Sequence, residues 1–147
     1  MTGRLRVAAA AAVLLAAGTG CVSPSRTNRD YQSKAANTAA AAASLLGTAD
    51  LAVQAAARHR APATYLSVLL GQAEQDLDAV QTSFDAVQPP SPAADTLRQK
   101  LDDLLTDAAD TLSSLRIAVR RGDLDSLPGI ARPLHGLRQR LASEAGS

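Results

Sequence analysis

Residues 62–92 read PATYLSVLLGQAEQDLDAVQTSFDAVQPPSP, and the apolar pattern in this stretch decides the fold. The apolar residues recur at alternating steps of four and three, which places them along one side of an α-helix. They are Leu66, Leu70, Ala73, Leu77, Val80, Phe84 and Val87. Because such a stripe must be covered by another element, the pattern predicts a helix over about 62–88 that packs against other helices.

Prolines mark both ends of this predicted helix. Pro62 suits a first helical position, where the missing amide hydrogen costs nothing. Pro89 and Pro90 block continuation, because a residue before proline is pushed out of the α conformation. Ser91 and Pro92 then have the residue types preferred at the N-cap and first position of a helix. The chain is therefore predicted to turn sharply near residue 90.

Three more segments carry helical stripes, over about 29–60, 92–121 and 123–144. The first stripe is mostly alanine, which lets a neighbouring helix approach closely. It consists of Ala35, Ala39, Ala42, Leu46, Ala49, Val53 and Ala56. The second consists of Leu97, Leu101, Leu104, Leu105, Ala108, Leu112, Leu115 and Val119. The third consists of Leu124, Leu127, Ile130, Leu134, Leu137 and Leu141.

Signals near residue 122 predict how the last two helices meet. Gly122 is expected just past the C-cap of the helix over 92–121, where glycine tolerates the left-handed conformation. Asp123 is expected to cap the next helix. Pro128, Gly129 and Pro133 interrupt that helix, so its first turn should be broken and the regular part should begin at about Gly129.

The links near residues 61, 90 and 122 are short, and short links make consecutive helices antiparallel neighbours. The composition also favours helices, because alanine and leucine dominate and aromatic residues make up only 2% of the chain. We therefore expect an all-α fold, an up-down-up-down antiparallel four-helix bundle over 29–144. The alternative is a three-helix bundle with a loose fourth helix, because the prolines within segment 123–144 make it the least regular of the four predicted helices.

The N-terminal segment has a different character. Met1–Arg6 is short and basic, and Val7–Ala17 reads VAAAAAVLLAA. This apolar run has the length of a secretory signal, about 7–15 residues. It is too short to span a bilayer, which requires about 20 apolar residues. The small residues 18–20 (GTG) then precede Cys21, the only cysteine in the chain. The pattern is typical of a signal peptide that ends just before Cys21.

Residues 18–21 resemble the lipobox of bacterial lipoproteins, and the resemblance covers this N-terminal segment only. Thr19 and Gly20 match the small residues that the family has before its cysteine, whereas Gly18 stands where leucine or another apolar residue is usual. The resemblance implies that the Cys21 thiol receives a diacylglyceryl group and that a peptidase cuts between Gly20 and Cys21. Two acyl chains give stable membrane anchoring. The alternative is an ordinary signal peptide, with Cys21 a bystander.

The expected organisation is a signal peptide over 1–20, a lipidated cysteine and polar tether over 21–28, and the bundle over 29–144. The bundle would be extracytoplasmic, anchored to the outer leaflet of the cell membrane. The excess of arginine over lysine, together with the abundant alanine, is typical of GC-rich genomes such as those of actinobacteria.

Several classes of chemistry lack their residues in this sequence. Without Arg4 and Arg6 the mature chain is close to neutral, which gives no basic face for nucleic acid. A di-iron bundle needs Glu-x-x-His and a c-type haem needs Cys-x-x-Cys-His, and neither motif occurs. Ser-x-x-Lys, Gly-x-Ser-x-Gly and glycine-rich phosphate loops are absent as well. We expect no cofactor and no enzymatic activity.

Two polar surfaces are weak candidates for binding. Asp103, Asp107 and Asp110 share one helix face and form a conceivable divalent-cation site, although a solvated outer face is the favoured explanation, because hard cations prefer a preorganised oxygen cage. Five arginines are expected to gather at one end of the bundle and could meet an anionic partner such as a wall polymer. Alternatively, they complement helix dipoles. These are Arg58, Arg60, Arg116, Arg120 and Arg121. His59 and His135 are expected too far apart to share a metal ion.

These observations favour a membrane-anchored, non-enzymatic interaction or structural module of the cell envelope, with an envelope protein or the cell wall as its partner. The alternative is a bundle that binds a lipid or another small apolar ligand. That alternative is favoured by the alanine-rich first helix and the interrupted fourth helix, which together could leave a groove.

Overall fold

The structure is a computed structural model, and it describes residues 27–146. The described chain forms three long helices, α2 (Asn28–Ala57), α3 (Ala63–Asp85) and α4 (Pro92–Arg120). A single turn, α5 (Leu127–Ile130), and a shorter helix, α6 (Arg132–Ala145), follow. The predicted signal peptide, the cleavage site, Cys21 and the tether up to residue 26 lie outside the described residues.

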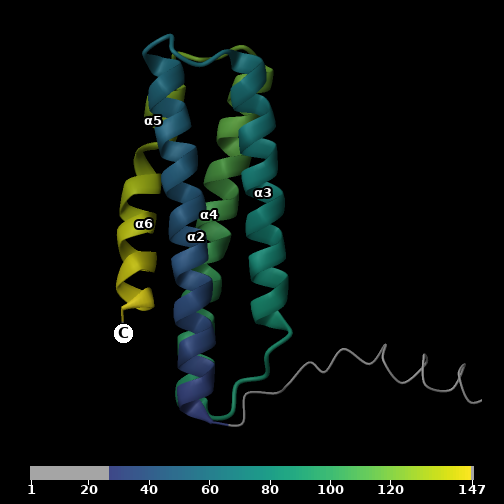
Figure 1. Ribbon diagram of the computed structural model, residues 1–147, viewed down its shortest axis with the longest axis vertical. Helices are drawn as coiled ribbons and strands as arrows, with labels where there is room; N and C mark the ends of the chain where they lie inside the picture. The colour runs from purple at the N-terminus through teal and green to yellow at the C-terminus, as the bar shows by residue number, and fades with distance from the viewer. Residues whose placement is uncertain (1–26, 147) are drawn as a thin grey trace, which may run out of the picture.

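The helices form an antiparallel four-helix bundle, as the sequence predicts (Figure 1). Helix α2 packs against α3 on one side and against α6 on the other, and α4 closes the bundle between α3 and α6. The alternative with a loose fourth helix is wrong. Leu134, Leu137 and Leu141 of α6 are buried, because they cover the alanine-rich side of α2.

The predicted stripes form one continuous core. Every stripe residue of α2 is buried, and so are the stripe residues of α3 except Val80, which is half-buried. The two largest fully buried side chains, Tyr31 of α2 and Phe84 of α3, contact each other with ring centroids 5.5 Å apart. Tyr31 is fully buried, although it lies before the alanine stripe that the sequence singles out.

Side-chain caps fix where α2 and α4 begin. Ser91 Oγ accepts a hydrogen bond from the Ala94 amide (3.3 Å) and donates one to Asn28 Oδ1 (2.8 Å), so the predicted N-cap also ties the start of α4 to the start of α2. Thr27 Oγ1 accepts from the Asp30 amide (3.1 Å) and caps α2. The predicted tether therefore ends earlier than residue 28, and α2 begins at Asn28.

Helices α2 and α4 end in the same hydrogen-bond pattern. The Gly122 and Asp123 amides donate to the carbonyls of Val119 and Ala118, with Gly122 at φ 73°, as the sequence predicts. Likewise the His59 and Arg60 amides donate to the carbonyls of Ala56 and Ala55. His59 has φ 55° and occupies the position that glycine usually fills.

Four predicted helix boundaries need correction. The Asp123 amide is used by the end of α4, so Asp123 does not cap the next helix; α5 begins after Ser126. The last helix is divided into α5 and α6 at Ala131, where Pro133 supplies no amide for a helical hydrogen bond. In addition, α2 ends at Ala57 and α3 at Asp85, each three residues before the predicted end.

Among the described residues, α2 is the one helix that is long and apolar enough to cross a membrane by length and composition. The core helix of a bundle meets the same test, and one side of α2 is buried against α3 and α6.

We expect His59→Gly to raise the free energy of unfolding by about 0.5–1 kcal/mol, because glycine adopts the left-handed conformation without the cost borne by a Cβ atom. Gly122→Ala, at the equivalent position of α4, should lower it by about 1 kcal/mol. Urea unfolding followed by circular dichroism measures both. Changes of the same sign at the two positions, or a reversed sign at either one, would contradict this account of the helix ends.

Candidate functional site

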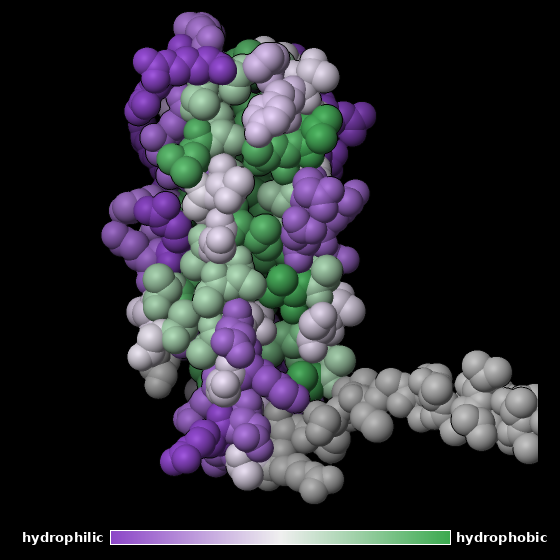
Figure 2. Space-filling model, in the orientation of Figure 1, coloured by the Kyte–Doolittle hydropathy of each residue, from purple (hydrophilic) through white to green (hydrophobic). Residues whose placement is uncertain are grey.

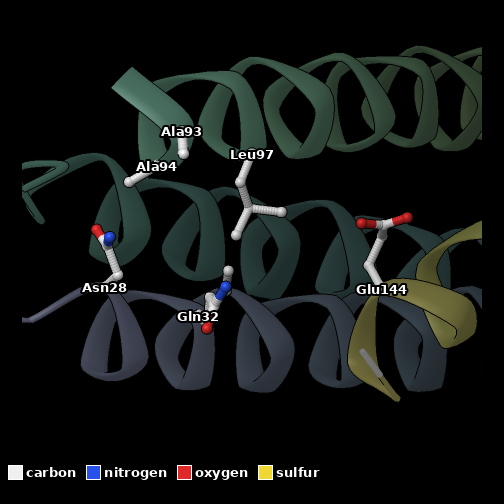
Figure 3. Close-up of a pocket in the computed structure, with 7 residues that line it drawn as sticks. Asn28, Gln32, Ala93, Ala94, Leu97 and Glu144 are labelled. Carbon is white, nitrogen blue, oxygen red and sulfur yellow. The ribbon is translucent and has the colours of Figure 1, made fainter. Parts of the chain in front are cut away.

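A groove opens where α6 ends before its neighbours do. Helices α2 and α4 extend past the C-terminus of α6, toward the end of the bundle where α2 begins (Figure 1). In the sequence this is the end next to the predicted tether. The uncovered surface between them forms a groove of about 230 Å³. It is lined by Asn28, Gln32 and Ala35 of α2, by Ala93, Ala94 and Leu97 of α4, and by Glu144 of α6 (Figure 3).

The groove combines an apolar lining with polar groups near its ends. Leu97 is only partly buried and lines the groove together with Glu144 of α6. Glu144 is the carboxylate of the groove, with a side chain only 13% exposed, and it forms an ion pair with Lys100 (2.6 Å) that holds the end of α6 against α4. Such a lining can hold an apolar chain and hydrogen-bond a polar end.

A polar cluster lies between α3 and α4, near Tyr31. Arg98 donates to the Asp85 carbonyl (3.1 Å) and lies 3.6 Å from the Asp102 carboxylate. The Tyr31 hydroxyl and Asp102 Oδ1 are buried without a hydrogen-bond partner. Burial raises the pKa of both groups; nearby Asp85 raises that of Asp102 further, and Arg98 opposes the shift. Arg98 already supplies the positive charge here, so the cluster is better suited to structure than to cation binding.

The arginine surface is smaller than the sequence predicts. Arg58, Arg120 and Arg121 are exposed at the end of the bundle where α2 and α4 both finish, and Arg60 follows in the adjoining link. Arg116 does not belong with them. Its Nε donates to Glu74 Oε2 of α3 at 2.5 Å, because α3 passes beside this part of α4. Arg116 is therefore a contact between helices.

The acidic and histidine candidates remain separate. Asp103, Asp107 and Asp110 are all exposed, and Asp107 and Asp110 face a shallow groove that also includes Arg140. In residues 27–146 no group of three His, Cys, Asp or Glu side chains is placed to hold a metal ion. His59 caps the end of α2, whereas His135 lies on α6 beside Gln139 (3.0 Å).

An exposed apolar patch lies across α2 and α3 in the half of the bundle far from the tether. Leu51, Tyr65 and Val68 are 65%, 57% and 69% exposed. Tyr65 and Val68 line a groove of about 280 Å³ together with Leu45 and Leu69. We name these four residues and Leu51 the α2–α3 patch. Figure 2 views this face, where apolar side chains run along the junction of the two helices. The sequence analysis missed the patch because its residues lie beside the predicted stripes.

We expect Arg116→Ala to lower the free energy of unfolding by about 1–2 kcal/mol, because it leaves the mostly buried Glu74 carboxylate without its partner. Arg120→Ala, which removes an exposed arginine one turn later, should change it by less than about 0.5 kcal/mol. If the two substitutions cost the same, the Arg116–Glu74 contact does not stabilise the bundle.

The raised pKa of Asp102 predicts a pH-dependent effect of Asp102→Asn. Below the ordinary value of 3.8 the carboxyl is protonated in both states and costs nothing. Above its raised folded-state pKa, burial of the charge opposes folding. The gain in unfolding free energy from Asp102→Asn should therefore be larger at pH 7 than at pH 3. Asp103→Asn, on the exposed face, is the matched variant. A gain that grows toward acid pH would contradict the assignment.

No protein-family model matches this chain, and searches of curated proteins and of solved structures gave no match either.

Proposed function

We propose that this chain is an exported lipoprotein, anchored through Cys21, whose bundle is a non-enzymatic interaction module of the cell envelope. The observation that carries the proposal is the position of Cys21, the only cysteine, directly after an apolar segment and the small residues 18–20. The diacylglyceryl group that is attached to such a cysteine through a thioether anchors the chain in the membrane.

The bundle that follows supports this reading in its geometry. Thr27 caps α2 six residues after Cys21, and an extended chain of that length reaches about 20 Å. The anchored end of the bundle would therefore lie close to the lipid, and the opposite end would carry no anchor. That far end carries the exposed arginines and the α2–α3 patch. A module of this shape presents its contact surfaces to other envelope components.

Binding of a lipid or another small apolar ligand is the second candidate. It is favoured by the groove beyond the end of α6, which lies at the tether end and is lined mainly by alanine and leucine (Figure 3). A carrier would copurify with its ligand, which native mass spectrometry of the membrane extract detects.

The anchor is tested by Cys21→Ser in the full chain expressed in a bacterial host. We expect the wild-type chain in the membrane fraction, labelled by an alkyne-modified fatty acid, and the variant unlabelled in the soluble fraction. As a control, Ser23→Cys added to the Cys21→Ser chain moves the thiol two residues onward and should not restore labelling. A Cys21→Ser chain that is still labelled and membrane-bound would contradict the proposal.

A further inference from the structure

Three of the four large apolar side chains that are exposed among the described residues belong to the α2–α3 patch. Helix α6 lies over α2 on the side away from α3, so no helix among the described residues covers the outer junction of α2 and α3. Leu51, Tyr65 and Val68 are each more than half exposed there. A cluster of exposed apolar side chains that includes a tyrosine is typical of a protein–protein contact.

Charges of opposite sign flank this patch along the bundle axis. Arg58 follows Leu51 by two helical turns, on the same side of α2, and is exposed at the far end of the bundle. Asp76 lines the other end of the patch groove on α3, where it accepts a hydrogen bond from Gln72 (2.8 Å). Within residues 27–146, neither Arg58 nor Asp76 forms an ion pair.

The spacing of these charges is self-complementary. The helix from Ala63, at the far end, to Asp76 rises about 20 Å, and Val68 lies close to the middle of that rise. On α2, Leu51 lies about 10 Å from Arg58 along the helix axis. Leu51 is therefore also about halfway between the levels of Arg58 and Asp76. A two-fold axis through the patch would therefore place Arg58 of each copy beside Asp76 of the other, with Leu51 and Val68 near the axis.

We propose that the α2–α3 patch is the interface of a head-to-head antiparallel homodimer, in which Arg58 of each copy pairs with Asp76 of the other. The inference rests on the proposed interaction role and names its partner, a second copy of the chain. The two tethers then emerge at opposite ends of the dimer. Both reach one membrane when the paired bundles lie along its surface.

Charge exchange tests the pairing. The full chain, extracted in mild detergent, is examined by sedimentation equilibrium with the detergent matched in density. Arg58→Asp and Asp76→Arg should each weaken the dimer at least tenfold, because each places two like-charge contacts in the interface. An equimolar mixture of the two variants should form dimers again, because every contact in the mixed dimer joins opposite charges. The double variant should also recover.

Matched controls separate the interface from general effects. Arg121→Asp changes the C-cap residue of α4, as Arg58→Asp changes that of α2, and should leave the dimer unchanged. Circular dichroism melting confirms that each variant keeps the bundle. Wild-type chain that stays monomeric at millimolar concentration, or a mixture that fails to recover, would overturn the inference.

Cysteine crosslinking gives an independent readout. Leu51→Cys lies near the proposed axis and should crosslink to itself under a short bifunctional maleimide, whereas Ile117→Cys, at an exposed α4 position, should not. The wild-type chain shows any contribution from Cys21. If Leu51→Cys crosslinks only to a different protein and not to a second copy of the chain, that protein occupies the α2–α3 patch and the dimer proposal is overturned. Failure of the dimer leaves the fatty-acid labelling of Cys21 unchanged, so the two proposals are separable.

Discussion

Ala39, Ala42 and Ala49 of α2 have no exposed surface, and the close packing of this small-residue seam is the constraint on which the bundle depends. Alanine at these positions lets α3 and α6 approach α2 from two sides, with α4 behind them. A larger side chain at the seam would push the neighbours apart and open the core. Near the start of α2, the larger side chains of Tyr31 and Phe84 contact each other within the core.

The lengths and the order of the helices explain where the surface features lie. Helix α6 is shorter than the helices it covers, so α2 and α4 remain uncovered beyond its last turn and the groove of Figure 3 opens there. On the other side, α2 and α3 meet without an outer helix, which leaves Leu51 and Val68 in solvent. The proposed anchor lies at the grooved end and the proposed dimer contact in the opposite half. The two features can therefore act independently.

Polar contacts also join neighbouring helices of the bundle. Glu74–Arg116 joins α3 to α4, and Lys100–Glu144 joins α4 to α6. Arg98 links the end of α3 to α4 beside the buried Tyr31 hydroxyl. Two of these contacts involve residues of the surfaces considered for binding. Arg116 is engaged within the bundle, and Glu144 combines an ion pair with a place in the groove.

The sequence by itself determined the helical stripes, the turn at residues 89–92, the glycine at the end of α4 and the lipobox-like residues before Cys21. These features are local, because periodicity and capping depend on residues within a few positions of one another. Only the tertiary structure decided that α6 packs firmly, that His59 ends α2 in a left-handed conformation, and that Arg116 meets Glu74. It also decided which apolar residues stay exposed. The physical reason is that burial depends on where neighbouring helices end and how they pack.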